Sequence, residues 1–140
     1  MSKVAVVYWS QTGNTEAMAN AVADGAKEKG AEVALMTSAD FSADDVANYD
    51  AVAFGCPAMG AEVLEEDEFQ PLWDACKANL SGKKIVLFGS YGWGDGEWMR
   101  NWEEDAKGAG AVLAADCLTV NEAPDDDAVA NCKALGAAIA

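Results

Sequence analysis

The chain contains no histidine among its 140 residues. This absence excludes Ser-His-Asp and Cys-His catalysis, zinc sites built on histidine, and haem held by a histidine ligand. No apolar run approaches the roughly 20 residues that a membrane-spanning helix needs, so a membrane is not an expected partner. None of the four cysteines belongs to a C-x-x-C pair, which argues against an iron–sulfur cluster or a thioredoxin-like site.

Basic residues are scarce: nine Lys and Arg stand against 24 Asp and Glu, for a net charge of −15. Nucleic acid is therefore not an expected partner, because its binding depends on cations that neutralise phosphates. The excess of negative charge favours partners with basic surfaces. No G-x-x-x-x-G-K-[ST] sequence occurs, which excludes a Walker phosphate loop, and no G-x-G-x-x-G follows the first predicted strand.

The composition is that of a globular protein, with 51% hydrophobic residues, and the length suffices for one buried core. We therefore expect residues 1–140 to form one domain. The N-terminal apolar run is cut short by Ser-Gln-Thr-Gly-Asn and lacks a small-residue cleavage site, so no signal peptide is expected. The predicted location is the cytoplasm, where the cysteines are most simply buried thiols.

Strand-like and helix-like segments alternate along the chain. Strands are predicted at 3–9, 32–36, 51–56 and 85–89, and in two short pieces at 111–114 and 117–120. Helices are predicted at 16–29, through 69–76, through 98–106 and at 127–138, with a helical turn at 42–48. This alternation predicts an α/β fold, a doubly wound five-stranded parallel sheet of order 2-1-3-4-5 with helices on both faces.

In such sheets, ligands bind beyond the carboxyl ends of the strands, where three loops meet: 10–15, 57–64 and 90–97. The first of these loops supplies hydroxyl groups, side-chain amides and backbone N–H groups at a helix start, which is typical of an anion site. The same residues are also ordinary helix caps, and a capping turn is the alternative. Because the loop has no Lys or Arg, it favours a phosphate monoester over a nucleoside triphosphate with magnesium.

The third loop, 90–97, places Tyr91 and Trp93 between glycines. Glycines permit close approach, and an aromatic ring held between them is suited to stacking on a flat ligand. Packing in the core is the alternative for Trp93. For the three other tryptophans at helical spacing, core packing is the favoured interpretation: Trp73, Trp98 and Trp102.

The second loop offers an apolar side chain and a carboxylate. Met59 would form a polarizable wall against a ring, Glu62 could accept a ring N–H, and Gly60 permits two peptide orientations. The acidic run at 62–68 is either a solvated helix start or a docking surface beside the site.

Together these segments resemble the flavodoxins, and in particular the short-chain flavodoxins of anaerobic bacteria. The string from Val7 to Glu16 is similar to the FMN phosphate loop of that family. The strings 55–60 and 88–94 are similar to its two flavin loops, and the resemblance spans essentially the whole chain.

The resemblance implies a flavodoxin-like fold and a low-potential one-electron carrier with non-covalent FMN. Such a protein shuttles between semiquinone and hydroquinone and replaces ferredoxin between redox enzymes. No catalytic residue or metal is implied. The cofactor-binding residues implied by the resemblance are Ser10, Gln11, Thr12, Gly13, Asn14, Thr15, Pro57, Ala58, Met59, Gly60, Ala61, Glu62, Ser90, Tyr91, Gly92, Trp93 and Gly94.

The resemblance also implies a role for each loop. The first loop would bind the phosphate. Met59 would cover the inner face of the isoalloxazine and Trp93 the outer face, while Glu62 would accept a hydrogen bond from flavin N3–H. The Gly60–Ala61 peptide would turn its carbonyl toward flavin N5 on one-electron reduction.

The implied partners are redox enzymes with basic docking faces, such as ferredoxin-type reductases, other oxidoreductases and hydrogenase-like systems. A monomer is expected. Acidic ridges at 62–68, 95–97 and 122–127 would steer these partners. Asn121, at the end of the last strand, is a candidate brace for the Trp93 loop.

Other functions need features that this sequence does not offer. An NAD(P)H-dependent FMN or quinone reductase needs a further pocket, for which 140 residues leave little room. A phospho-receiver module needs acidic residues at Ser10-Gln11 and an aspartate near Cys56-Pro57. A low-molecular-weight phosphatase needs Cys-x5-Arg, which does not occur.

Overall fold

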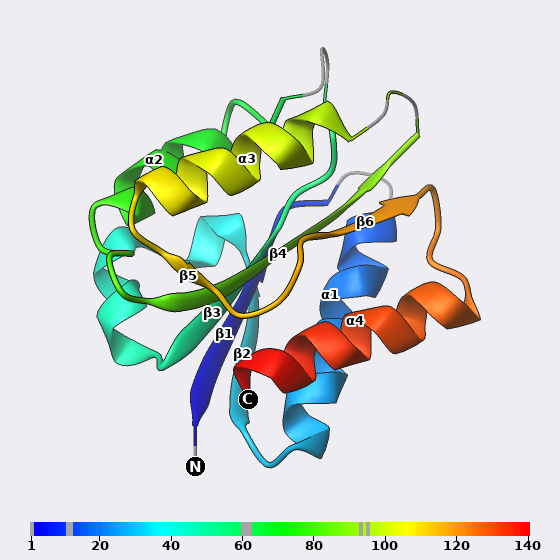
Figure 1. The fold of residues 1–140 in the computed structure, drawn as a ribbon, viewed down its shortest axis with the longest axis horizontal. Helices are drawn as coiled ribbons and strands as arrows, with labels where there is room; N and C mark the ends of the chain where they lie inside the picture. Colours follow the sequence, from blue (N-terminus) through cyan, green and yellow to red (C-terminus); the bar gives the residue numbers. More distant parts are fainter. Residues whose placement is uncertain (1, 11–12, 60–62, 93, 95) are drawn as a thin grey trace.

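The structure, a computed structural model, describes residues 2–10, 13–59, 63–92, 94 and 96–140. Its centre is a parallel sheet in which strands follow the order β2-β1-β3-β4-β5 (Figure 1). The strands are β1 (Lys3–Tyr8), β2 (Glu32–Thr37), β3 (Ala51–Gly55), β4 (Lys84–Tyr91), β5 (Val112–Leu113) and β6 (Leu118–Asn121). The predicted order 2-1-3-4-5 is confirmed.

Helices cover both faces of the sheet, as predicted. They are α1 (Asn14–Glu28), α2 (Phe69–Lys77), α3 (Glu97–Gly108) and α4 (Asp126–Ile139), with short 3₁₀ helices η1 (Ser38–Asp40) and η2 (Ala43–Asn48). Helices α1 and α4 pack together on one face, while α2 and α3 lie side by side on the other (Figure 1). In the described part of the chain, no helix combines the length and apolar character needed to cross a bilayer.

The fifth position of the sheet is shared by two short strands. β5 pairs with the first residues of β4, and β6 pairs with its last four, from Phe88 to Tyr91. This pairing carries β4 two residues beyond its predicted end at Gly89, because Ser90 and Tyr91 lie opposite Val120 and Asn121 of β6. Ser90 and Tyr91 therefore belong to a strand, where the sequence had indicated a loop.

The two faces of the sheet have different cores. Helices α1 and α4 pack mostly aliphatic and alanine side chains against it. The α2–α3 face is aromatic: Trp73 meets Phe54 and Trp102 edge to face, with centroids 5.2 and 5.6 Å apart. Trp73, Trp98 and Trp102 are all buried, which confirms their assignment to the core.

Helices α1 and α4 approach each other through glycine. A Cβ atom added to Gly25 would overlap the backbone of Lys133, and one added to Gly136 would overlap the carbonyl of Val22. Only glycine allows this approach, since every other residue would force the two helices apart. The contact fixes the position of α1, whose N-terminus follows the first predicted loop.

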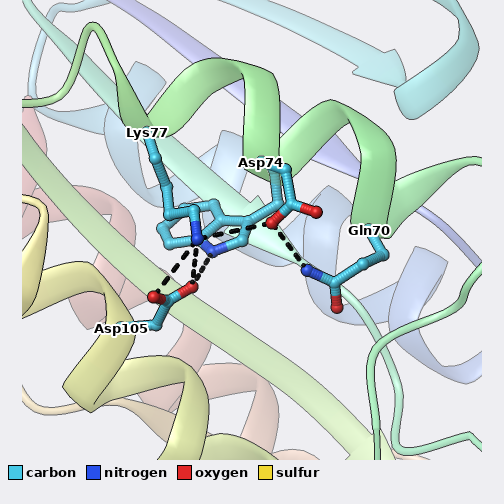
Figure 2. Close-up of polar contacts among 5 residues, drawn as sticks. Gln70, Asp74, Lys77 and Asp105 are labelled. Atoms are coloured by element: carbon cyan, nitrogen blue, oxygen red, sulfur yellow. Dashed lines mark hydrogen bonds and ion pairs between the residues drawn. The ribbon is translucent and has the colours of Figure 1, made fainter.

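A polar network joins α2 to α3 beside the aromatic core (Figure 2). The Trp73 indole N–H donates to Asp105 Oδ2 at 2.8 Å, and Lys77 Nζ lies 3.0 Å from the same oxygen. Lys77 also pairs with Asp74, whose carboxylate accepts a hydrogen bond from Gln70. Partial burial raises the pKa of Asp105, but the hydrogen bonds from Trp73 and Lys77 outweigh it and hold the pKa below its usual value.

The glycine contact predicts a strong effect of one methyl group. We expect Gly136→Ala to lower the free energy of unfolding by about 1–3 kcal/mol, because the added Cβ strains the α1–α4 contact. Gly108→Ala is the matched control, since it also lies in a helix but has no atom within 4 Å of the added Cβ. Urea unfolding of the apoprotein measures both. Equal stability of the two variants would contradict the prediction.

The Asp105 network predicts a pH-dependent contribution to stability. A carboxylate whose pKa is lowered by folding stabilises the folded protein at pH values above its ordinary pKa of about 3.9. This contribution is lost as the pH falls through the folded-state pKa. The free energy of unfolding of the wild type should therefore exceed that of Asp105→Asn by about 0.5–1 kcal/mol near pH 6, and this difference should vanish in acid. The difference is small because the carboxylate is partly exposed. Urea unfolding across pH tests this, with Glu104→Gln as the exposed control; a difference independent of pH would refute it.

Candidate functional site

The loops that follow β1, β3 and β4 enclose a cavity at the carboxyl end of the sheet. Its volume is about 450 Å³, within the usual range of cofactor sites. The lining residues are Ser10, Asn14, Thr15, Pro57, Ala58, Met59, Ser90, Tyr91, Gly92, Glu122 and Ala123. All three predicted loops therefore contribute to one cavity.

The polar end of the cavity is the start of α1. Gly13 precedes the helix with φ +92°, a left-handed conformation that favours glycine. The Ser10 hydroxyl oxygen accepts hydrogen bonds from the backbone N–H of Gly13 at 3.1 Å and of Glu16 at 3.3 Å. Two backbone donors of this helix start thus converge on the Ser10 oxygen, a capping contact of the kind that the sequence left open as the alternative. Two further residues predicted for this site, Gln11 and Thr12, lie outside the described residues.

A buried pair of hydroxyl groups joins the first loop to the third. The hydroxyls of Thr15 and Ser90 lie 3.0 Å apart, and the Ser90 backbone N–H also points to the Thr15 oxygen at 3.4 Å. The two residues are 1% and 4% exposed. Because buried hydroxyls need partners, this pair fixes the start of α1 against the end of β4.

The second loop forms the apolar wall. Pro57, Ala58 and Met59 are half-buried, and the Ala58 N–H donates to the Ser90 carbonyl at 3.0 Å. Met59 and Val63 exchange two backbone hydrogen bonds of 2.9 Å in an antiparallel bridge. The residues between them, Gly60, Ala61 and Glu62, lie outside the described residues.

Tyr91 and the glycines of the third loop occupy different places. Tyr91 lines the cavity from the end of β4 and packs against Trp98, with ring centroids 5.6 Å apart. Gly92 also lines the cavity. Gly94 is exposed and has φ +86°, and it is not among the lining residues. Trp93 lies outside the described residues.

The segment after β6 also lines the cavity. The sequence indicated 122–127 only as an acidic ridge that steers partners, not as part of the cofactor site. Glu122 has φ 59°, the only positive φ of a non-glycine residue in the described part of the chain. Its backbone N–H donates to the Tyr91 carbonyl at 2.7 Å, and the Asn121 amide reaches the same oxygen at 3.4 Å. The predicted strand order 2-1-3-4-5 could have indicated this position, because it places the end of the fifth strand beside the end of the fourth.

The electrostatics of the cavity are unusual for an anion site. None of the described lining residues is Lys or Arg, and Glu122 brings a carboxylate. An anion would therefore be held by hydroxyls, backbone N–H groups and the dipole of α1. This arrangement suits a small phosphate group attached to a flat apolar body, and FMN has that form. The described lining residues contain no nucleophile with an adjacent base, so they do not support covalent catalysis.

The cysteines take no part in this chemistry. Burial raises the pKa of Cys56, directly before the apolar wall, to about 12, and the pKa of Cys76 and Cys132 to about 11. Burial, together with a hydrogen bond to Glu103, raises the pKa of half-buried Cys117 to about 12. All four cysteines are free, and their raised pKa values favour the protonated thiol at neutral pH.

Comparison with known proteins gives one consistent result. A family model described as flavodoxin matches residues 6–136. A flavodoxin of Clostridium beijerinckii is 47% identical over 135 residues, covering 96% of this chain and 97% of its own. A flavodoxin of Megasphaera elsdenii is 47% identical over 137 residues, or 98% of each chain. The solution structure of the two-electron reduced Megasphaera elsdenii flavodoxin has a TM-score of 0.89 at 46% identity, covering 97% of each chain.

The hydroxyl pair predicts a site-specific loss of stability. We expect Thr15→Val to lower the free energy of unfolding of the apoprotein by about 1–3 kcal/mol, because it leaves the Ser90 hydroxyl and N–H buried without that partner. Thr37→Val, at an exposed position, should change it by less than about 0.5 kcal/mol. Chemical denaturation measures both variants. A Thr15→Val protein with the same denaturation midpoint and the same denaturant dependence as the wild type would contradict the role given to the hydroxyl pair.

Proposed function

The chain belongs to the flavodoxin family, and from this membership and the geometry of the cavity we propose a low-potential one-electron carrier that replaces ferredoxin between redox enzymes. Flavodoxins are FMN-binding electron carriers and not enzymes, and FMN is the cofactor of this chain. The observation that carries the proposal is the cavity itself, which has an anion-binding helix start at one end and an apolar wall at the other.

Bound FMN would supply a centre that takes up and releases electrons one at a time. The residues at the start of α1 would hold its phosphate: Ser10, Asn14 and Thr15 through their side chains, and Gly13 through its backbone. Ser90 would support this end, because it holds Thr15 in place. The neutral donors account for binding without any basic side chain among the described lining residues.

The apolar wall would receive the isoalloxazine ring. Met59 lines the cavity from the second loop and Tyr91 from the end of β4, so both would contact the ring system. Pro57, Ala58 and Gly92 complete this part of the lining. The roles implied by resemblance for the residues outside the described ranges remain predictions: Gln11, Thr12, Gly60, Ala61, Glu62 and Trp93.

The low reduction potential of the bound flavin would follow from the charges around the cavity. Apolar walls disfavour additional negative charge in the cavity, and no cation from the described lining residues offsets it. A reduced state that carries an extra negative charge is therefore held at a cost, and releases its electron readily. The distant carboxylates contribute less, because salt screens them over about 10 Å.

The distribution of charge suits partners with a basic face. Lys3 and Lys84 lie at the amino ends of β1 and β4, away from the cavity, and Lys27, Lys77 and Lys107 lie in the last turns of their helices. The helix starts near the cavity carry acidic residues instead. These acidic helix starts would steer basic surfaces toward the cofactor.

An electron carrier implies redox partners, and we infer that these are ferredoxin-type reductases, other oxidoreductases and hydrogenase-like systems with basic docking faces. The encounters would be small and transient. We further propose that residues 1–140 act as one FMN-binding domain, as a monomer in the cytoplasm.

Stepwise anaerobic reduction tests the function. The FMN-loaded protein should lose its oxidised spectrum in two separate one-electron stages, the second at a much lower potential, and NAD(P)H alone should not bleach it. Riboflavin is the matched control ligand: it lacks the phosphate, so it should bind the apoprotein far more weakly than FMN. A single two-electron step, or bleaching by NAD(P)H without a partner enzyme, would favour a reductase.

A further inference from the structure

We propose that Glu65 is a positioning residue for the cofactor, because it anchors the loop that forms the apolar wall of the cavity to the N-terminus of α2. The proposal rests on the FMN-carrier function given above. It assigns a structural role in the site to a member of the acidic run 62–68, which the sequence alone marked only as a helix start or a docking surface.

Glu65 is a buried residue, at 7% exposure, and its carboxylate accepts three backbone N–H groups. Oε1 accepts from Glu68 at 2.7 Å and from Phe69 at 2.9 Å, and Oε2 accepts from Asp67 at 2.8 Å. Helix α2 has no side-chain hydrogen bond from its own N-cap residue, Glu68. Glu65 therefore supplies the cap from outside the helix.

Glu65 is tied to the cavity wall by its backbone. Its N–H donates to the Sγ atom of buried Cys56 at 3.4 Å, which closes the segment 56–65 at its base. Within this segment, the Met59–Val63 bridge makes a second closure, and Leu64 is buried in the aromatic core. The wall residues thus lie between Cys56 and Glu65, and Glu65 connects them to α2.

The carboxylate is charged when it performs this role. Burial raises the pKa of Glu65, but the N–H groups of Phe69, Glu68 and Asp67 outweigh burial and hold it below its usual value. The N-terminal dipole of α2 also favours a negative charge at this place. Charge-assisted hydrogen bonds of this kind are among the stronger ones in proteins, so the anchor has the strength to fix a loop.

Neighbouring carboxylates separate this role from a simple effect of charge. Glu66 is exposed and stands one residue away. Removing the charge of Glu66 changes the same acidic run by the same amount, but leaves the three hydrogen bonds of Glu65 intact. Glu66→Gln is therefore a matched control for Glu65→Gln.

Two substitutions of Glu65 remove the anchor in different ways. Glu65→Gln replaces one carboxylate oxygen by an NH₂ group, which then faces a backbone N–H donor. Glu65→Asp keeps the charge but is one methylene shorter, and it cannot span all three donors. Both variants should raise the dissociation constant for FMN about tenfold, as expected from the loss of one charge-assisted hydrogen bond, whereas Glu66→Gln should stay within about twofold.

The experiment compares these three variants with the wild type by three readouts. FMN titration of the apoproteins gives the dissociation constants, and anaerobic titration of the FMN-loaded proteins gives the two one-electron potentials. Amide hydrogen exchange follows the N–H groups of Asp67, Glu68 and Phe69. We expect faster exchange at these amides, weaker FMN binding and shifted potentials in both Glu65 variants, and none of these effects beyond twofold binding in Glu66→Gln.

Two results would overturn the proposal. One is a Glu65→Asp protein with wild-type FMN affinity, potentials and exchange. The other is equal shifts in Glu65→Gln and Glu66→Gln, which would leave charge as the whole effect. If Glu65→Gln fails to fold, Glu65→Asp decides alone. Failure of the proposed function is a separate outcome: the wild type itself would bind no FMN or would lack the one-electron stages.

Discussion

The buried contact between Thr15 and Ser90 holds the three parts of the site in one arrangement. Ser90 is the second-to-last residue of β4: its hydroxyl meets Thr15 at the start of α1, and its carbonyl accepts the Ala58 N–H of the second loop. Parallel pairing brings these loops to the same edge of the sheet, but it does not fix their distances. The hydrogen bonds of Ser90 set the distances between these loops, and the loops line the cavity.

The absence of basic side chains from the described lining residues sets the chemistry of the cavity. Neutral donors bind an anion through fixed dipoles, so they add no positive charge that would stabilise a reduced ring. A lysine or arginine would strengthen phosphate binding and at the same time raise the reduction potential. In the proposed function, anion binding at a helix start and a low potential are thus two consequences of the same choice of residues.

The strand order and the helices could be predicted, because β1 and β3 are buried on both faces and appear in the sequence as continuous apolar runs. The end of β4 could not. Ser90 and Tyr91 precede a glycine-rich stretch and resemble a loop locally, and only their pairing with β6 makes them a strand. Glu122 was missed for the same reason: its place beside the cavity depends on a bond to Tyr91, about thirty residues away along the chain.

The two faces of the sheet support the site by different means. On one face, α1 and α4 pack closely through Gly25 and Gly136, and the N-terminus of α1 leads to the proposed phosphate site. On the other face, hydrogen bonds at Asp105 join α2 to α3 (Figure 2). Hydrogen bonds at Glu65 join α2 to the apolar wall. Packing between glycines tolerates little change, whereas hydrogen bonds at a helix terminus can be strengthened or weakened singly.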